Sequence, residues 1–371
     1  MSMVEWKKLD DCLDFEQPTP YLVNSTEYDD SYEIPVLTAG QSLLLGYTNE
    51  TEGIYKASKE NPTIIFDDFT TSFHWIDFNF KVKSSAMKML RPKKDVNFRY
   101  VYYSMCGINF IPGGHQRHWI SKYSQFEIPI PSLSEQARIV GILDTFTASV
   151  ENLKQQIAER RKQYEYYRDQ LLDLEGKEGV VMKSLGEVCS FIRGPFGGAL
   201  KKEIFVESGY AIYEQQHAIY GKWDFRYFID SKKFEEMKRF EVHSGDILMS
   251  CSGTMGKTSI VPNNNIPGII NQALLKLSVK PSINNRFLKV FMDSRWFQES
   301  LKNKTAGGAI QNVASVSILK ELEIPLPSLD EQSRIVSILD TFEASIANLE
   351  AQLKEREKQY EYYRNKLLTF E

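Results

Sequence analysis

Apolar residues recur at alternating spacings of four and three in two separate stretches of the chain. In the first stretch they are Ile139, Leu143, Phe146, Val150, Leu153, Ile157, Tyr164, Tyr167 and Leu171, and in the second Ile335, Leu339, Phe342, Ile346, Leu349, Leu353, Tyr360, Tyr363 and Leu367. This spacing is typical of a coiled-coil helix with one narrow apolar seam. Each seam is interrupted once, at Arg160 and at Arg356, and we expect this shared interruption to help fix the register of two paired helices.

The two stretches belong to copies of one sequence of roughly fifty residues, repeated at a constant offset of 196. Because each helix alone would expose its seam, the copies are predicted to pack on each other. A short-loop hairpin is excluded, since more than a hundred residues separate the copies. An antiparallel pair is favoured because the linker at 176–180 is too short to return the chain along the whole rod; a parallel pair would put both preceding segments at one end.

Both copies open with the sequence Pro-x-Pro-Ser-Leu-x-Glu-Gln, at residues 129–136 and 325–332. The prolines predict an extended entry to each helix. Ser134 and Asp330 are the expected N-cap residues, because their side chains can accept hydrogen bonds from the first helical turn.

The segments that precede the copies share only scattered residues, and we call each of them a head. Four regions result: a first head at 1–125, a helical region at 126–175, a second head at 176–321 and a second helical region at 322–371. In the second head, 210–213, 246–250 and 273–277 are short strand candidates. Asp67-Asp68 of the first head is predicted to correspond to Gly245-Asp246. The predicted fold class is mixed α+β: two α/β heads separated by an antiparallel two-helix coiled coil, with a pseudo-twofold internal repeat.

Composition places the chain among ordinary globular proteins, with 42% hydrophobic and 25% charged residues. No apolar stretch approaches the length of a membrane span, and the start lacks the pattern of a signal peptide. The four cysteines, Cys12, Cys106, Cys189 and Cys251, lie far apart without zinc-type spacing. A cytoplasmic location with reduced thiols is therefore expected.

Charge is distributed unevenly along the chain, although its net value is only −4. Residues 180–321 carry 19 Lys and Arg against 13 Asp and Glu, a balance of +6, whereas residues 1–125 carry 13 against 16, or −3. A basic face therefore remains possible on either head. In the first head the candidates are Lys81, Lys83, Lys88, Arg91, Lys93, Lys94 and Arg99, with a merely solvated face as the alternative.

Signatures of catalysis are weak in this sequence. Asn61-Pro62-Thr63 lacks the second proline of an adenine methyltransferase motif, and no glycine-rich S-adenosylmethionine loop is found. Gly256-Lys257-Thr258 fails as a phosphate loop because Cys251 stands where that motif requires glycine. His115 and His118 have no clustered Cys or acidic partners, which argues against a metal site. We therefore expect a chain that is not an enzyme and binds neither a cofactor nor a metal.

The order of head, Pro-x-Pro motif, coiled helix, head, same motif and same helix resembles the specificity subunit of type I restriction-modification systems over essentially the whole chain. The second head adds the segment 245–250, the sequence Ser-Gly-Thr-Met-Gly at 252–256 and Asn271-Gln272, which are similar to that family's target recognition domain. The first head departs from the pattern, since 66–73 contains no Ser-Gly-Thr-x-Gly.

The resemblance implies a non-catalytic reader of double-stranded DNA. Each head, as a target recognition domain, would read one half of a bipartite site, and the helices would set the unread gap. Two modification subunits would dock on the helical frame and bring S-adenosylmethionine, while restriction subunits would join the complex.

Base reading requires side chains that present paired donors and acceptors to a groove edge, with lysines on phosphates. The candidates in the first head are Thr70, Thr71, His74, Lys81, Lys83, Gln116, Arg117 and His118. Those in the second head are Gln215, Gln216, Tyr220, Ser252, Thr254, Lys257, Gln311 and Asn312. For each Asn or Gln, the alternative is a hydrogen bond that caps its own loop.

Two other interpretations remain open from the sequence. The chain could be a coiled-coil adaptor whose heads bind proteins, or the recognition module of a type II-like restriction-methylation enzyme. An adaptor would select no DNA sequence, and copurification would identify the catalytic partner of a recognition module.

Overall fold

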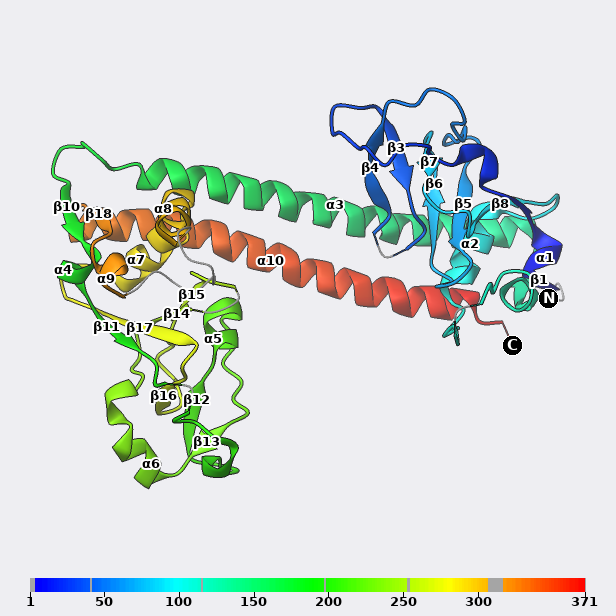
Figure 1. The fold of residues 1–371 in the computed structure, drawn as a ribbon. Coiled ribbons are helices and arrows are strands. Elements are labelled where there is room, and N and C mark those ends of the chain that lie inside the picture. Colours follow the sequence, from blue (N-terminus) through cyan, green and yellow to red (C-terminus); the bar gives the residue numbers. More distant parts are fainter. Residues whose placement is uncertain are drawn as a thin grey trace. The chain divides into compact units, whose positions relative to one another are not determined.

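The structure of the protein is a computed structural model, which describes residues 4–40, 42–114, 116–196, 198–251, 254–305 and 316–370 (Figure 1). The chain divides into two compact units, Met1–Lys154 with Ala351–Glu371, and Gln155–Glu350. Each unit thus combines one head with part of both long helices, and each is described by itself below.

The first head contains two small sheets. One has the order β2-β8-β5-β6 with all neighbours antiparallel, and the other has the order β4-β3-β7, in which β3 is antiparallel to β4 and parallel to β7. The strands are β2 (Leu13–Glu16), β3 (Ile34–Leu37), β4 (Leu44–Thr48), β5 (Thr63–Asp67), β6 (Phe73–Ile76), β7 (Lys81–Val82) and β8 (Met87–Pro92). The helices are α1 (Leu9–Cys12), the 3-10 turns η1 (Thr19–Tyr21) and η2 (Tyr123–Gln125), and α2 (Phe98–Cys106).

The second head repeats this topology strand for strand. Its sheets have the orders β11-β17-β14-β15 and β13-β12-β16, and β12 is again antiparallel to one neighbour and parallel to the other. The strands are β11 (Cys189–Arg193), β12 (Tyr210–Tyr213), β13 (Phe228–Ile229), β14 (Ile247–Ser250), β15 (Thr258–Ile260), β16 (Gly268–Ile270) and β17 (Leu274–Val279). The helices are α4 (Leu185–Val188), α5 (Gln215–Tyr220), α6 (Ser231–Glu236), the 3-10 turns η3 (Lys202–Ile204) and η4 (Lys238–Phe240), α7 (Asn285–Met292), α8 (Arg295–Thr305) and α9 (Val316–Lys320).

The three strands predicted in the second head are confirmed as β12, β14 and β17. The predicted correspondence between Asp67-Asp68 and Gly245-Asp246 is wrong. Asp67 is the last residue of β5, whereas Asp246 precedes the first residue of β14, and these two strands occupy the same place in their sheets. A whole strand length therefore separates the two acidic positions.

The Pro-x-Pro segments form strands that pair with the first strand of their own head. In the first unit β9 (Glu127–Ile130) pairs antiparallel with β1 (Glu5–Lys8), and in the second β18 (Glu323–Leu326) pairs antiparallel with β10 (Val181–Ser184). The expected extended conformation is thus confirmed. These segments add a two-stranded ribbon to each head, immediately before the long helix begins.

The long helices, α3 (Leu133–Leu172) and α10 (Leu329–Leu368), have 40 residues each. The predicted N-caps, Ser134 and Asp330, are wrong by two residues, since both already lie within the first turn. Ser132 and Ser328 take that place: Ser132 Oγ accepts from Glu135 N at 3.4 Å and Ser328 Oγ from Glu331 N at 3.3 Å.

The helices run antiparallel within each unit, as predicted. In the first unit the ring of Phe146 stacks on that of Tyr363, with 5.2 Å between ring centroids. In the second unit Tyr167 stacks on Phe342 at 5.3 Å. These two pairs are images of each other at the offset of 196, which is the pseudo-twofold relation that the repeat predicts.

The interrupted seam positions carry cations that lie over aromatic rings of the opposite helix. The guanidinium of Arg160 is 5.9 Å from the centroid of Phe342, and that of Arg356 is 5.8 Å from the centroid of Phe146. Attraction between a cation and the face of a ring operates at such distances. Each arginine therefore selects one position on the opposite helix, as expected for a residue that helps fix register.

The remaining seam residues differ in burial. Val150 and Ile157 are each 8% exposed, while Leu153, Ile346, Leu349 and Leu353 are half-buried. Tyr164 donates its hydroxyl to Glu343 at 2.9 Å, and Tyr360 makes an edge contact with Tyr103. The first seam positions of each helix are fully buried in the core of the head: Ile139 and Leu143 in the first unit, and Ile335 and Leu339 in the second.

A buried glutamine joins each long helix to a short helix of its head. Gln136 is 1% exposed; its Oε1 accepts from Asn97 N, and its Nε2 donates to Pro131 O, both at 2.8 Å. Gln332 is 0% exposed and repeats this arrangement with Asn284 N at 2.8 Å and Pro327 O at 2.9 Å. Asn97 and Asn284 are the N-caps of α2 and α7, so the glutamine links the starts of two helices.

An ion pair about two turns further along the long helix completes each joint. Arg99 Nε lies 2.8 Å from Asp144 Oδ1, and a guanidinium nitrogen of Arg286 lies 2.7 Å from Asp340 Oδ1. Burial alone would lower the pKa of Arg286, but the carboxylates of Glu343 and Asp340 raise it overall. The joint therefore has the same chemistry in both units.

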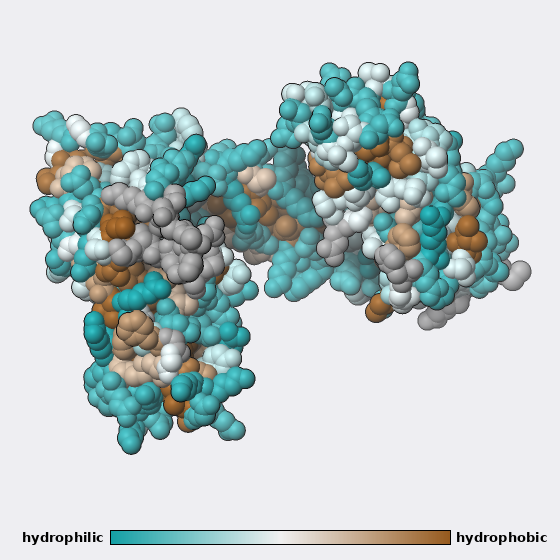
Figure 2. Space-filling view, in the orientation of Figure 1, coloured by the Kyte–Doolittle hydropathy of each residue, from teal (hydrophilic) through white to brown (hydrophobic). Residues whose placement is uncertain are grey.

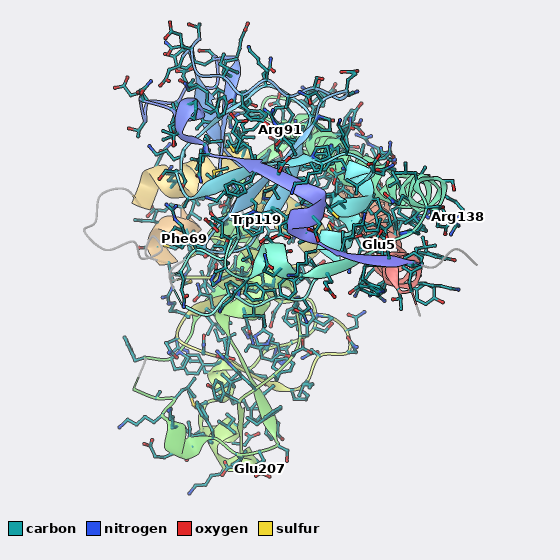
Figure 3. All side chains as sticks on the ribbon, turned by 90° about the vertical axis from the view of Figure 1, so that its right-hand side faces the viewer. Glu5, Phe69, Arg91, Trp119, Arg138 and Glu207 are labelled. Atoms are coloured by element: carbon teal, nitrogen blue, oxygen red, sulfur yellow. The ribbon has the colours of Figure 1, made fainter. Side chains whose placement is uncertain are left out.

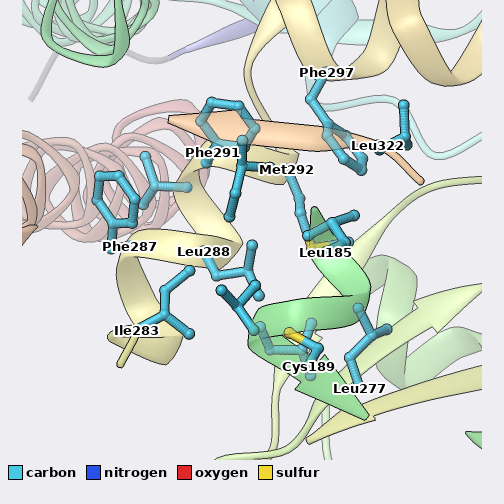
Figure 4. Packing of buried hydrophobic residues seen from close by; sticks show 14 of the residues in the cluster. Leu185, Cys189, Leu277, Ile283, Phe287, Leu288, Phe291, Met292, Phe297 and Leu322 are labelled. Carbon is cyan, nitrogen blue, oxygen red and sulfur yellow. The ribbon is translucent and has the colours of Figure 1, made fainter. Parts of the chain in front are cut away.

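The core of the second head lies where α7 meets α4, the sheet and the long helix (Figure 4). Phe287, Leu288 and Phe291 of α7 face Leu185 of α4 and Leu277 of β17, and all five are at most 2% exposed. Since Ile335 and Leu339 belong to the same cluster, the head and the start of α10 share one hydrophobic core.

We predict that Gln332→Ala destabilises the second unit, because it leaves the buried N–H of Asn284 without an acceptor. A buried unsatisfied donor costs about 1–3 kcal/mol. The free energy of unfolding from chemical denaturation measures this loss. Gln155→Ala is the matched control, since Gln155 is exposed and bonds only within its own helix; an equal loss in both variants would contradict the proposed joint.

Candidate nucleic-acid interface

In the first head, the turn between β5 and β6 carries the candidates Thr70 and Thr71. The carboxylate of Asp67 accepts from Phe69 N at 2.9 Å and from Thr70 N at 2.7 Å. Thr71 has a φ of 59°, a left-handed conformation that side chains adopt at some cost. Local hydrogen bonds thus hold this turn in a defined shape and leave Thr70 exposed.

Asp68 connects this turn to the loop at 116–120. Its side chain is 1% exposed; Oδ1 accepts from Trp119 N at 2.7 Å, and Oδ2 lies 3.3 Å from Lys88 Nζ. The backbone oxygen of Asp68 also accepts from His118 N at 2.8 Å. Figure 3 labels Phe69 and Trp119, which stand on the two connected segments. The structure therefore brings together two loops that the sequence analysis had singled out separately.

A third segment, at 39–40, lies against the same turn. His74 Nε2 is 2.9 Å from Gly40 O, and Ser72 Oγ donates to Ala39 O. The candidate His74 is thus half-buried, with one ring nitrogen already engaged. Three segments therefore meet at the turn between β5 and β6. Asp67 shapes this turn and Asp68 joins it to the loop at 116–120, and sequence reasoning missed both roles, although an acidic pair directly after an apolar strand was the available signal.

The structure sorts the first-head candidates by exposure. Thr70, Lys83, Gln116 and Arg117 are exposed, whereas Thr71 is 8% exposed. The predictions for Lys81 and His118 are wrong, because their side chains are 2% and 0% exposed and cannot reach a DNA groove. His118 lies under Phe110, with 5.5 Å between ring centroids.

The buried side chain of Lys81 bonds the loop that contains Glu50 and Glu52. Its Nζ donates to Glu52 O at 2.6 Å and lies 2.9 Å from Glu50 Oε2. Burial acts to raise the pKa of Glu50, but hydrogen bonds from Ser25 N, Lys81 and Asn24 N lower it to about 2. Lys81 therefore stabilises the fold of the first head.

The predicted basic face of the first head is largely neutralised by acidic partners within the first unit. Lys88 is 1% exposed beside Asp68, and Arg91 lies 3.0 Å from Glu16. Lys93 lies 3.6 Å from Asp14, and Arg99 pairs with Asp144. Lys83, Arg117 and Lys122 are exposed basic residues on or next to the segments that meet at this turn.

In the second head, a serine organises the equivalent turn, between β14 and β15. Ser250 Oγ donates to Thr254 O at 2.5 Å and accepts from Lys257 N at 3.1 Å. Gly256 has a φ of 75°, and a Cβ there would lie 2.8 Å from Leu301 Cδ2, so only glycine fits without displacement. Thr254 and Lys257 are exposed on this turn.

Helix α5 carries the other candidates and packs beside this turn. Ser259 Oγ, on β15, donates to Ala218 O at 3.1 Å, which fixes the helix against the strand that follows Lys257. Gln215 and Gln216 are half-buried, and Tyr220 is 70% exposed at the end of the helix. The candidates Ser252, Gln311 and Asn312 lie outside the described residues.

Among the residues that the structure describes, no group of three or more His, Cys, Asp or Glu could hold a metal ion. Over the same residues, no helix is long and apolar enough to span a membrane. The exposed candidates in both heads are instead hydroxyl, amide and cationic side chains on tightly held loops, which is a set suited to phosphates and base edges.

Comparison with known proteins places this arrangement in a family. The family described as "Type I restriction modification DNA specificity domain" matches residues 1–160 and 177–358, one match for each head with its helix. The chain belongs to this family.

Two relatives match along nearly their whole length. The type I restriction enzyme EcoR124I/EcoR124II specificity subunit of Escherichia coli is 40% identical over 392 residues, covering 99% of this chain and 94% of that one. A putative type I restriction enzyme specificity subunit of Haemophilus influenzae is 32% identical over 402 residues, covering 100% and 96%.

Solved structures share the fold at low identity. The S subunit of a type I restriction-modification system from M. genitalium superposes with a TM-score of 0.61 at 17% identity, covering 100% of this chain and 98% of that one. A second chain, from a structural study of the assembly of a type I system, gives 0.60 at 18% identity, covering 99% and 97%. These likenesses support the mixed fold with two heads.

We predict that Asp68→Ala destabilises the first unit by about 3–5 kcal/mol, because the variant leaves the buried ammonium of Lys88 without its charge partner. Chemical denaturation measures the loss, and Thr70→Ala, at an exposed position of the same turn, is the control.

The double variant Asp68→Ala/Lys88→Met tests the cause. Removing both charges relieves the unpaired charge and should recover part of the lost stability. A double variant no more stable than Asp68→Ala would show that Asp68 does not act through Lys88.

Proposed function

We propose that this chain is the DNA sequence-specificity subunit of a type I restriction-modification complex, in which each head reads one half of a bipartite site. The observation that carries the proposal is the relation between the heads. They share one topology and one joint to the helical frame, but their exposed turns differ in sequence and in the residues that hold them. Two heads with different exposed turns on one repeated helical frame are what recognition of an asymmetric, bipartite DNA site requires.

The helical frame would set the length of the gap between the two half-sites. A helix of 40 residues is about 60 Å long at 1.5 Å per residue. This exceeds one turn of duplex DNA, which repeats about every 34 Å. Antiparallel pairing with a register fixed by aromatic stacks and arginines would keep the gap constant.

We propose further that the chain is itself non-catalytic and holds no cofactor. S-adenosylmethionine would then enter with the modification subunits, and restriction subunits would join the same complex. The name and near-complete coverage of the Escherichia coli relative support this assignment, since it is a specificity subunit of a type I restriction enzyme.

Two equivalent cavities, one in each unit, are proposed as docking positions for two copies of the modification subunit. One, of about 360 Å³, is lined by Trp6, Pro129 and Leu368; the other, of about 270 Å³, by Met182, Pro325 and Leu172. Pairing of β1 with β9 and of β10 with β18 places Trp6 and Met182 at equivalent positions. A duplicated cavity with an exposed apolar edge fits a partner that binds twice.

The frame is tested by deleting one heptad from each helix, residues 153–159 and 349–355, and selecting bound sequences from a random duplex library with the complex. The deletion shortens the pair by about 10 Å, so the gap should shorten by about three base pairs. Both half-site sequences should remain the same. An unchanged gap would refute the role of the frame, and the absence of any selected sequence from the unaltered chain would favour a protein-binding adaptor.

Docking is tested by Trp6→Asp and Met182→Asp, which place a charge at each apolar cavity edge. Native mass spectrometry with the modification subunit should show one bound copy for each single variant and none for the double variant. Val206→Asp, at an exposed apolar position away from both cavities, should keep two copies. Two copies bound to the double variant would exclude these cavities as docking positions.

A further inference from the structure

Phe196 is the most exposed of the large apolar side chains in the described part of the second head, at 96%. It lies on the loop that follows β11, outside every candidate that the sequence analysis assigned to DNA. Removal of a phenylalanine ring from water is favourable, so a nearly fully exposed ring can contribute to the binding of a partner that covers it.

The loop is held firmly against the turn that precedes β17. Gly194 N donates to Leu274 O at 2.9 Å, and a Cβ on Gly194 would lie only 1.8 Å from Asn271 O. Asn271 Oδ1 accepts from Ala273 N at 3.0 Å, which shapes the turn that leaves Gln272 exposed. Phe196 and Gln272 are therefore presented together by two backbones in direct contact.

Cationic side chains surround this pair. A cavity of about 760 Å³ is lined by Phe196 and Gln272 together with Arg193, Lys233 and Arg239. The one acidic lining residue, Glu236, is already paired with Lys233 at 3.1 Å. On the viewed face of this unit, hydrophobic atoms lie between hydrophilic ones (Figure 2). The net positive charge of the rim favours a polyanion as the occupant.

We propose that this surface is a second-head contact with duplex DNA, in which Phe196 inserts at a base step, Gln272 bonds a base edge, and Arg193 and Arg239 hold the flanking phosphates. The inference rests on the proposed function, because it assumes that the head reads DNA. The combination is specific to a duplex: phosphates bind guanidinium groups, amides pair with base edges, and apolar wedges enter between bases. An uncharged protein surface would use the ring but not the two arginines.

The first head has a different structure at the corresponding place. There, only Gln17 and Pro18 stand between β2 and η1, whereas residues 194–201 stand between β11 and η3. The shorter connection contains no aromatic residue. The Phe196 contact belongs to one half-site only.

The test uses the complex of the full chain with its modification subunits and a duplex carrying the selected site, with 2-aminopurine placed in turn at each position of both halves. Phe196→Ala should weaken binding roughly 5- to 150-fold, the range for one lost base–aromatic contact. Insertion of the Phe196 ring should unstack a neighbouring 2-aminopurine and so raise its fluorescence when the complex binds. Phe196→Ala should abolish this increase at one step in one half-site. Phe196→Trp should retain both the affinity and the fluorescence increase. Arg239→Ala should lower the salt dependence of binding by about one phosphate contact.

Ile266→Ala is the matched control, since Ile266 is a 41%-exposed apolar residue of the same head that does not line this cavity, and its binding should equal that of the unaltered chain. If Phe196→Ala binds the site with unaltered affinity and fluorescence, this inference is overturned while the proposed function stands. If the unaltered complex selects no bipartite site, the proposed function fails, and the inference fails with it.

Discussion

The buried glutamine at the start of each long helix is the constraint on which the remaining structure depends. Each glutamine, Gln136 or Gln332, accepts a hydrogen bond from the N-cap residue of a short helix in the head. Each also donates one to the carbonyl of the proline, Pro131 or Pro327, that precedes the N-cap serine of the long helix. Because these polar groups are removed from water, any displacement of the helix start would leave them unpaired. Together with the shared hydrophobic cores, this joint makes each head continuous with its part of the frame.

The joint between head and long helix is the same in both units, whereas the turns that the two heads expose differ. The equivalent turns are organised by Asp67 and Asp68 in one head and by Ser250 and Gly256 in the other, although the strands around them have the same order. Hydrogen bonds to the carboxylate of Asp67 hold the first turn, and hydrogen bonds of the Ser250 hydroxyl hold the second. Because the two equivalent turns are held by different residues, they expose different side chains, as recognition of two unlike half-sites requires.

The sequence predicts the frame well because heptad periodicity and the repeat are local, additive signals that survive without knowledge of tertiary contacts. Individual site residues depend on partners that are distant along the chain. Lys81 is buried by Glu50 and Glu52, and His118 by Phe110 and the loop bound to Asp68, and nothing in their neighbouring sequence distinguishes them from the exposed Lys83 and Arg117. Phe196 was missed for the opposite reason, since an apolar residue is expected to be buried.

The structure gives the chain two different heads on one repeated helical frame, as reading of a divided DNA site requires. The most direct measurement is the pattern of methylated adenines in the genome of the source cell, because it reports both half-sites and their separation without purification of the complex. We expect one motif with two defined halves and an unspecified gap of constant length. A continuous motif, or halves separated by variable gaps, would contradict the account.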